Sequence, residues 1–296
     1  METVSMPSRI TAKTAVIGLL GSPIRHSRSP VMLNSVYEAM GLDFVYVAFD
    51  VGADRAQEAA AAVRTLGLRG ANVTMPLKRA ILPHLDRLSP AAELAGAVNV
   101  IVNDAGALTG HLTDGAGFMA SLAEARVHHA GRHMVVLGAG GAGMAVAIQA
   151  ALDGVGAITV FNRRDAFFDV AQALVTKLQG RVDCPVTLQD LDDRQALGRA
   201  IGAADILVNA TPIGMDGSEG QMALPDASLL GPQLVVCDLI YVPKETHLLK
   251  EAARRGCRTV SGIGMQLYQA VPAFKLWTGH DMDLNVARAA LFGGAK

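Results

Sequence analysis

Short apolar runs alternate with helical patterns along most of the chain. Apolar runs of strand length lie at 14–20, 44–49, 70–73 and 97–103, and later at 134–137, 157–161, 186–188, 205–209, 234–239 and 258–260. Between and after them, apolar residues recur with helical spacing at about 30–41, 53–66, 90–96, 115–126, 142–152, 166–179, 190–201, 244–255, 264–278 and 283–292. Strands that alternate with helices are typical of parallel sheets, so the pattern predicts an α/β fold.

The most specific local signal lies at 134–165. A strand breaks into a glycine-rich turn, followed by an Ala-rich helix and a second strand. In a dinucleotide site, successive glycines permit a tight turn, let the backbone approach a pyrophosphate, and let helix and strand pack closely. The helix N-terminus adds free N–H groups and a positive dipole end. A tight turn without a ligand is the alternative, but it leaves four costly glycines unexplained. We expect the dinucleotide on Gly138, Ala139, Gly140, Gly141, Ala142 and Gly143.

The length of 296 residues suits two domains, each with its own core. We predict an N-terminal α/β domain at 1–113 and a Rossmann-type, doubly wound dinucleotide-binding domain at 114–263. The strand pattern ends before the last two helices. We therefore expect the helices of 264–296 to return to the first domain and complete it.

The residues after the second strand of the glycine motif bear on the cofactor. Asn162 is followed by Arg163, Arg164 and Asp165. Two guanidinium groups can clamp a 2′-phosphate, which favours NADP, although one Arg could also be a solvated surface charge. Asp165 can instead accept hydrogen bonds from the ribose hydroxyls and would repel that phosphate, which favours NAD. These residues leave both cofactors open.

Composition excludes several other classes. A formal net charge of -1 gives no electrostatic case for nucleic acid or an acidic membrane surface. The 3 cysteines lie far apart, without metal-binding spacing, so we expect no metal and reduced thiols. There is no uninterrupted apolar run of about 18 residues. The first residues lack an apolar segment and a small-residue cleavage site, so we expect no signal peptide. We expect a cytoplasmic protein that binds a small molecule, as a monomer or homodimer. No apolar stripe exceeds core needs, so the sequence does not decide between these two states.

Polar residues follow the early strands, where open α/β sheets bind ligands. Ser27 and Ser29 lie in the loop after the first strand, and Thr74 follows the strand at 70–73. Lys78 comes just after the turn that Thr74 opens. The alternatives are a helix cap for Ser29 and a solvent-exposed side chain for Lys78.

Later segments add further candidates. Asn99 lies within an apolar run, and a buried Asn needs partners from the protein or a ligand. Asp114 precedes the helix at 115–126 and could simply cap it. The loops NATPIGM (209–215) and DLIYVP (238–243) follow strand ends, where the nicotinamide end of a cofactor would rest.

Taken together, these motifs resemble the shikimate dehydrogenase family, and most of all its quinate/shikimate dehydrogenase branch. The matching segments occur in family order: GSPIRHSRSP (21–30), ANVTMPLK (71–78), GAVNVIVND (96–104), TDGAGF (113–118), VLGAGGAG (136–143), FNRRDAFFD (161–169), NATPIGM (209–215), DLIYVP (238–243) and GIGMQLYQA (262–270). The resemblance implies a substrate-binding first domain. It also implies reversible oxidation of a ring hydroxyl of shikimate or quinate to the 3-dehydro ketone, with hydride transfer to a nicotinamide cofactor.

The resemblance also implies roles for individual residues. Lys78 and Asp114 would form the catalytic pair, which takes the hydroxyl proton as hydride leaves. The substrate would be held by Ser27, Ser29, Thr74, Asn99, Tyr241 and Gln269. Besides the glycine turn, the cofactor would be contacted by Asn162, Arg163, Arg164, Asp165, Phe167, Thr211, Met215, Gly262 and Met265. Asp165, with Phe167 nearby, implies that NAD is accepted or preferred, with NADP possible.

Two positions depart from the family pattern. Leu33 stands where the family often has His, and Leu112 where it usually has Asn before the Thr-Asp pair. If that Asn orients Asp114, the rate or the substrate range shifts; if it only supports the loop, activity survives. Two alternative functions stay open: a biosynthetic NADP-dependent shikimate dehydrogenase, and a ligand-binding homologue with little turnover.

Overall fold

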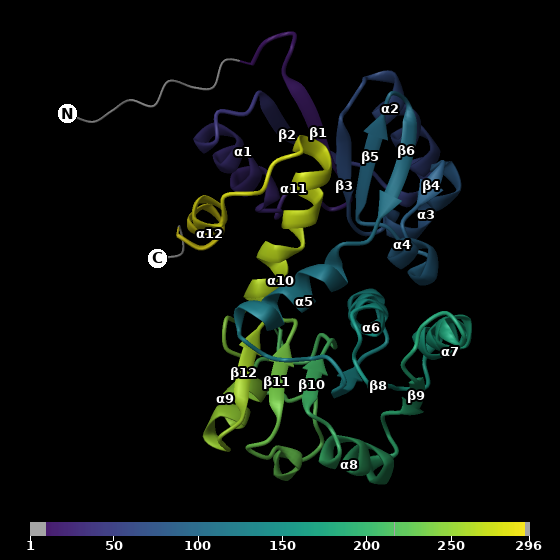
Figure 1. The fold of residues 1–296 in the computed structure, drawn as a ribbon, viewed down its shortest axis with the longest axis vertical. Coiled ribbons are helices and arrows are strands. Elements are labelled where there is room, and N and C mark those ends of the chain that lie inside the picture. Colours follow the sequence, from purple (N-terminus) through teal and green to yellow (C-terminus); the bar gives the residue numbers. More distant parts are fainter. Residues whose placement is uncertain (1–9, 216, 294–296) are drawn as a thin grey trace, which may run out of the picture. The chain divides into compact units, whose positions relative to one another are not determined.

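The computed structural model describes residues 10–215 and 217–293, which divide into two compact units. Of these residues, the first unit holds 10–92, 96–111 and 271–293, and the second holds 93–95 and 112–270. Each unit contains a six-stranded sheet with helices, which confirms the α/β fold (Figure 1). Residues 264–270, which the sequence places with the first domain, are grouped with the second unit.

The sheet of the first unit is mixed, with the order β2-β1-β3-β5-β6-β4. Strands β1, β2 and β3 run parallel, whereas β5 is antiparallel to both β3 and β6. Their bounds are β1 Ala15–Gly21, β2 Phe44–Asp50, β3 Gly70–Val73, β4 Arg87–Leu88, β5 Val100–Asp104 and β6 Ala107–His111.

Strands β4 and β6 are not predicted by the apolar pattern. The sequence predicts a turn at 104–106, and that turn is the tip of a β5–β6 hairpin, with Ala105 and Gly106 at positive φ. Strand β6 reads ALTGH, which lacks the apolar run of a buried strand. Its Gly110 packs so closely that an added Cβ would lie 2.6 Å from a Val98 methyl group. Because its residues are small or polar, β6 does not appear as an apolar run in the sequence.

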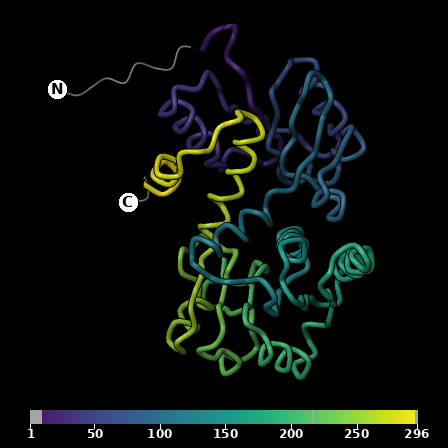
Figure 2. Tube along the Cα trace, viewed as in Figure 1, coloured from purple at the N-terminus to yellow at the C-terminus, as the bar shows by residue number. Residues whose placement is uncertain are grey.

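The helices of the first unit come from both ends of the chain. They are α1 Ser29–Ala39, α2 Ala56–Thr65, α3 Leu77–Ala80, α11 Ala270–Thr278 and α12 Leu284–Phe292, while α4 Pro90–Ala95 is divided between the units. Figure 2 shows the yellow C-terminal segment beside the purple helix α1, which α12 contacts. Arg69 donates to the carbonyls of Leu276 and Trp277, and the Trp277 indole donates to Ile101 O at 2.9 Å. These bonds fix the C-terminal helix α11 to the sheet.

The sheet of the second unit is parallel throughout, with the order β12-β11-β10-β7-β8-β9. Strand β7 is buried, and its alternate residues enter two different cores: Met134 and Val136 one, Val135 and Leu137 the other. Helices on both faces explain this unbroken apolar run. The strands are β7 His133–Leu137, β8 Ala157–Asn162, β9 Val186–Asp190, β10 Ile206–Asn209, β11 Val235–Asp238 and β12 Arg258–Ser261.

The helices of the second unit follow the predicted alternation. They are α5 Asp114–Glu124, α6 Gly141–Leu152, α7 Ala166–Leu178, α8 Arg194–Gly202, α9 His247–Arg254 and α10 Ile263–Tyr268. The single helix expected at 264–278 is wrong: α10 ends before Gln269, and α11 starts at Ala270. Pro272 explains the break, because it has no N–H to continue the α10 hydrogen-bond ladder but fits the first turn of a new helix.

Candidate active site

In the first unit, the predicted polar residues meet at one edge of the sheet. Thr74 directly follows β3, and Asn99 directly precedes the antiparallel β5, in which Val100 pairs with Asn72. The end of one strand and the start of its antiparallel neighbour share an edge. The Asn99 carbonyl accepts from Val73 N at 2.8 Å, which holds the two segments together.

Backbone hydrogen bonds place Lys78 at this same edge. Its carbonyl accepts from Val98 N at 2.9 Å, one residue before Asn99, and Thr74 N donates to Leu20 O at the end of β1. Lys78 lies in the short helix α3 and is half-buried. This partial burial disfavours the alternative of a solvent-exposed lysine.

Ser29 opens helix α1 without capping it. The N-cap residue is Arg28, and the structure shows no side-chain cap, so the helix-cap alternative for Ser29 is wrong. Ser29 N donates to the Ser27 hydroxyl at 3.3 Å, and the Ser29 side chain lies beside Tyr46 and opposes the rise in the Tyr46 pKa. The two serines thus stand together beside a tyrosine that the sequence analysis did not select.

A buried polar chain connects Ser29 to Asn99. The Tyr46 hydroxyl donates to Asn72 Oδ1 at 2.7 Å, and Asn72 Nδ2 donates to Asn99 O at 3.1 Å. Burial raises the pKa of Tyr46, so its hydroxyl keeps its proton. Sequence reasoning missed both links of this chain. The signal was Asn72, a polar residue inside the buried strand GANV, which needs a partner.

In the second unit, helix α5 positions Asp114. The helix begins at Asp114, and its N-cap is Thr113, so a capping role for Asp114 is wrong. The Thr113 hydroxyl donates to Gln269 O at 2.8 Å. An added Cβ at Gly117 would lie 2.5 Å from Gln269 N, and one at Gly115 would lie 2.2 Å from Ala145 O. The glycines of TDGAGF therefore bring α5 against both α10 and the glycine-turn helix α6.

The two departures from the family pattern are both buried and apolar. Leu33 lies within α1 and is 1% exposed, and Leu112 is 8% exposed just before Thr113. Leu112 therefore packs where an Asn would need hydrogen-bond partners.

The glycine turn has the shape that a dinucleotide phosphate needs. Gly138 has a φ of +97°, and an added Cβ at Gly143 would lie 2.0 Å from Gly138 O. By contrast, a Cβ at Gly140 or Gly141 would meet nothing within 4 Å. Gly140 is the N-cap of α6 and provides no side-chain cap, so open space faces the N–H groups of that helix. These residues fit a pyrophosphate.

At the end of β8, Asn162 organises the loop that follows. Its Oδ1 accepts from Ala139 N at 2.9 Å, and its Nδ2 donates to Asp165 Oδ1 at 2.9 Å. Asp165 Oδ1 also accepts from Phe167 N and so caps α7. Arg164 pairs with Asp190, while the exposed Arg163 side chain forms no hydrogen bond or ion pair with any described residue.

The two later loops start from a shared buried network. Asp238, 1% exposed, accepts from Asn209 Nδ2, Ile240 N and the Thr246 hydroxyl at 3.1, 3.1 and 2.7 Å. Asn209 Oδ1 in turn accepts from the Thr211 hydroxyl at 2.7 Å. Sequence reasoning missed Asn209 and Asp238, although polar residues at the ends of buried strands were the signal.

The remaining cofactor candidates lie on or near these loops. Met215 and Tyr241 are each 44% exposed, and Met265 packs partly buried against one core. An added Cβ at Gly262 would lie 2.2 Å from Leu239 O, so only glycine fits there. The loop at 209–215 also reaches the glycine turn, because a Cβ at Gly138 would lie 3.0 Å from the Ala210 carbonyl.

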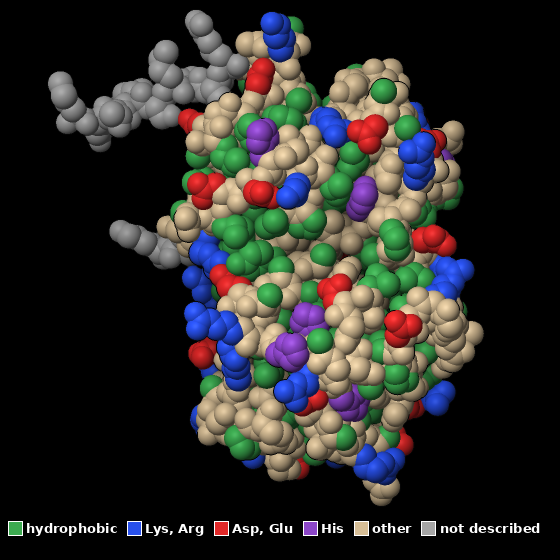
Figure 3. Space-filling view, viewed as in Figure 1, with side chains coloured by type: hydrophobic (Ala, Val, Ile, Leu, Met, Phe, Trp, Pro, Cys, Tyr) green, Lys and Arg blue, Asp and Glu red, His purple; other side chains and the backbone are tan. Residues whose placement is uncertain are grey.

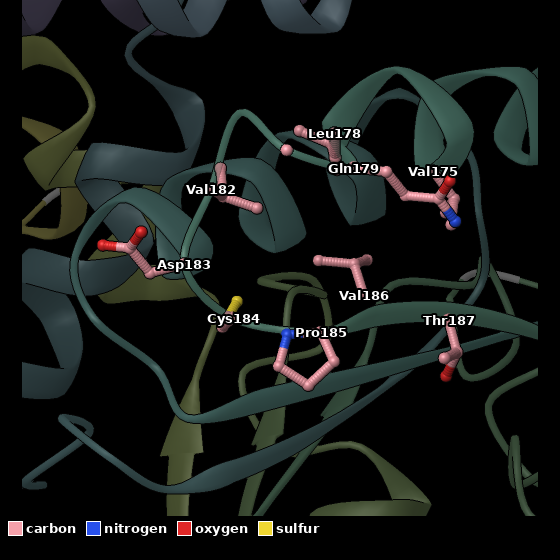
Figure 4. A pocket seen from close by; sticks show the side chains of 10 residues that line it. Val175, Leu178, Gln179, Val182, Asp183, Cys184, Pro185, Val186 and Thr187 are labelled. Atoms are coloured by element: carbon pink, nitrogen blue, oxygen red, sulfur yellow. The ribbon is translucent and has the colours of Figure 1, made fainter.

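Two cavities lie away from these residues. One, of about 440 Å³, is lined by the end of α7 and the start of β9, including Leu178, Cys184 and Val186 (Figure 4). The other, of about 700 Å³, borders the start of β1 and Arg69. Both lie at the amino ends of strands, whereas ligands of open α/β sheets bind at the carboxyl ends.

The acidic, cysteine and histidine side chains and the apolar helices bear on the type of site. Among the described residues, no group of three His, Cys, Asp or Glu side chains could hold a metal ion. No helix in the same part of the chain is long and apolar enough to cross a membrane. Acidic and basic side chains are interspersed over the face shown in Figure 3.

Comparisons with known proteins agree with these features. Models of the shikimate dehydrogenase substrate binding domain and the shikimate 5′-dehydrogenase C-terminal domain match residues 19–101 and 262–292. The chain is 46% identical over 290 residues to a shikimate dehydrogenase (NADP(+)) of Listeria monocytogenes, covering 98% of this chain and 100% of the relative. It is 44% identical over 286 residues to a quinate/shikimate dehydrogenase of Escherichia coli, covering 97% and 99%.

A solved structure is similar along nearly the whole chain. The crystal structure of shikimate 5-dehydrogenase from Listeria monocytogenes, in complex with shikimate and NAD, has a TM-score of 0.94 and 46% identity, covering 97% of this chain and 99% of that one. Fold, glycine turn and relatives define a dinucleotide-dependent oxidoreductase that acts on a CH–OH group. The chain belongs to the shikimate dehydrogenase family.

Proposed function

We propose that the protein is a quinate/shikimate dehydrogenase that accepts NAD and prefers it to NADP. The observation that carries the cofactor preference is the fixed carboxylate of Asp165. Asn162 and Phe167 N hold its Oδ1, and no described residue bonds its Oδ2. A carboxylate held in this way accepts hydrogen bonds from ribose hydroxyls and repels a 2′-phosphate.

In this proposal the first unit binds the ring acid. Ser27 and Ser29 hold its carboxylate, while Thr74 and Asn99 bond ring hydroxyls. The support is the shared sheet edge and the polar chain from Ser29 to Asn99. From the second unit, Gln269 bonds a ring hydroxyl, and its carbonyl is anchored by Thr113.

Lys78 and Asp114 are the proposed catalytic pair. In the oxidation direction, the substrate O–H and C–H bonds break as a C=O bond forms. Lys78 takes the hydroxyl proton, and Asp114 orients the ammonium group that results. A nicotinamide cofactor held by the glycine turn of the second unit would supply the acceptor for the hydride, which carries both electrons. In reduction, Lys78 returns the proton to the ketone oxygen.

The second unit holds the proposed cofactor. The turn from Gly138 to Gly143, Ala139 and Ala142 included, receives the pyrophosphate, and Asp165 with Phe167 receives the adenosine ribose. The nicotinamide end is bordered by Thr211, Met215, Tyr241, Gly262 and Met265, and Tyr241 also borders the substrate. The network around Asp238 supports the loops that carry the first three of these residues.

A biosynthetic NADP-dependent shikimate dehydrogenase is the second candidate. Arg163 favours it, because this exposed guanidinium has no ion pair with any described residue and is available to a phosphate. The name of the Listeria monocytogenes relative also specifies NADP(+).

Initial rates of the purified protein test the proposal, with quinate and shikimate each assayed against NAD and NADP. We expect turnover of both acids, with a higher kcat/KM for NAD. Asp165→Ala should lower the NAD/NADP ratio of kcat/KM by about tenfold, because a charged hydrogen bond to the ribose is lost. Shikimate turnover with NADP alone would support the second candidate. Binding of shikimate without turnover in any combination would indicate a ligand-binding homologue.

A further inference from the structure

Arg164 is already paired within the protein. Its Nε donates to Asp190 Oδ2 at 2.7 Å, and its guanidinium carbon lies 4.9 Å from the centroid of the Phe168 ring. The ion pair and the ring contact hold the guanidinium from two sides. Yet 71% of the Arg164 side chain is exposed, so a ligand can reach it.

Asp190 is a fixed acceptor rather than a chance surface partner. It is the last residue of β9 and pairs in register with Asn162, the last residue of β8. Its Oδ1 accepts from Asp192 N at 3.0 Å, while Oδ2 takes the Arg164 bond. Its side chain is only 25% exposed. The backbone N–H of Asp192 and the Arg164 guanidinium hold its pKa below the usual value, so it is charged at neutral pH.

The pairing distinguishes the two arginines that follow β8. A 2′-phosphate would have to compete with Asp190 for the Nε of Arg164, whereas Arg163 has no such competitor among the described residues. The side-on guanidinium–phosphate geometry pairs the Nε–H with a parallel Nη–H, so a committed Nε removes this bidentate arrangement.

We propose that Asp190 is a positioning residue for cofactor selectivity, which withholds Arg164 from the 2′-phosphate of NADP. The inference rests on the proposed function, since it assumes that the adenosine ribose lies beside Asp165. It adds a determinant on a different strand, outside the NRRD segment that the sequence singles out.

The test replaces Asp190 by Asn in the full-length protein. Asp190→Asn keeps the acceptor for Asp192 N but removes the charge that holds Arg164. The probes are adenosine 2′,5′-bisphosphate and ADP, titrated calorimetrically. We expect the bisphosphate to bind about tenfold more tightly to the variant, the size of one charged hydrogen bond, and ADP affinity to change less than about twofold.

Two sets of variants control for simple charge removal. Asp169→Asn removes the same charge from an exposed position in the first turn of α7, and it should not change bisphosphate affinity. In the otherwise wild-type protein, Arg164→Ala should weaken bisphosphate binding by less than about twofold. In the Asp190→Asn background, Arg164→Ala should abolish the gain in bisphosphate affinity. A gain that survives Arg164→Ala, or an equal gain in Asp169→Asn, would overturn the inference.

Kinetics provide a readout that a merely structural role would not change. We expect the NADP/NAD ratio of kcat/KM to rise about tenfold in Asp190→Asn. The rise should come from a lower KM for NADP. The calorimetric probes need no substrate. A protein that shows the expected probe affinities but oxidises neither acid would therefore contradict the proposed function and support this inference.

Discussion

At the scale of single residues, Asp238 illustrates a buried acid held by three donors. Burial raises its pKa, while Thr246, Ile240 N and Asn209 oppose that rise by hydrogen bonding. Asp238→Ala would leave these three donors without their acceptor in a buried place. We expect the free energy of unfolding to fall by about 3 kcal/mol, measured by urea denaturation. The exposed Asp183 is a matched control. Asp183→Ala should change the free energy of unfolding by less than about 0.5 kcal/mol.

His111 should make stability depend on pH. Burial lowers its pKa below the ordinary value of 6.5, despite the opposing charge of Asp104. The folded state therefore binds fewer protons than the unfolded state between the lowered pKa and 6.5, so stability rises with pH across that window. The contribution is complete above 6.5 and is lost as pH falls.

Urea midpoints at two pH values on either side of this window check the His111 prediction. The wild type should have the lower midpoint in acid, and His111→Gln should reduce the difference between the two midpoints. An unchanged difference in the variant would assign the pH dependence to other groups.

Residue identity alone predicted the conformation of some candidate-site residues but not of others. Gly138 and Gly143 were predictable, because positive φ and close approach each require glycine. The position of Ser29 was not, since a Ser before a helix usually caps it. Only the fold shows that Ser29 faces Tyr46, a residue that a strand pattern assigns to the core.

At the scale of elements, the glycines of α5 decide how three helices pack. Gly117→Ala would place a methyl group 2.5 Å from the backbone of Gln269, which cannot rotate away. We expect a loss of about 1–3 kcal/mol in stability from such overpacking. Gly198, in α8, is the control, because an added Cβ there would meet only Leu229 Cδ2 at 3.7 Å. Gly198→Ala should raise the free energy of unfolding by about 0.5–1 kcal/mol. Thermal or urea denaturation of both variants measures these changes.

The parallel sheet of the second unit was predictable from sequence because each strand is an apolar run between helices. The mixed sheet of the first unit was not. Its strands β4 and β6 contribute few apolar residues and gain their place by hydrogen bonding along an existing edge. Likewise, the break between α10 and α11 depends on one missing N–H at Pro272, which helical spacing does not record.

At the scale of the whole molecule, the two proposed ligands should protect different segments of the chain from hydrogen exchange. NAD alone should lower hydrogen exchange at 138–144 and 162–168, where the glycine turn and the loop after β8 present backbone N–H groups. Shikimate alone should lower it at 27–33 and 73–78. Each ligand at about 100 times its Kd should add about 2.7 kcal/mol of stability. Protection of 73–78 by NAD without any at 138–144 would contradict these site assignments.

The clamp between Arg69 and helix α11 joins residues that lie 208 positions apart in the chain. Ribosomal synthesis delivers these two parts at different times, with the second unit between them. At about 5–20 residues per second, that delay is about 10–40 s. The buried residues of both second-unit cores are all synthesised by Val260, whereas the first unit is completed only when Trp277 covers Gly70 and Ile101. A nascent chain is therefore expected to contain every buried core residue of its nucleotide-binding half before the helix that completes its substrate-binding half is made.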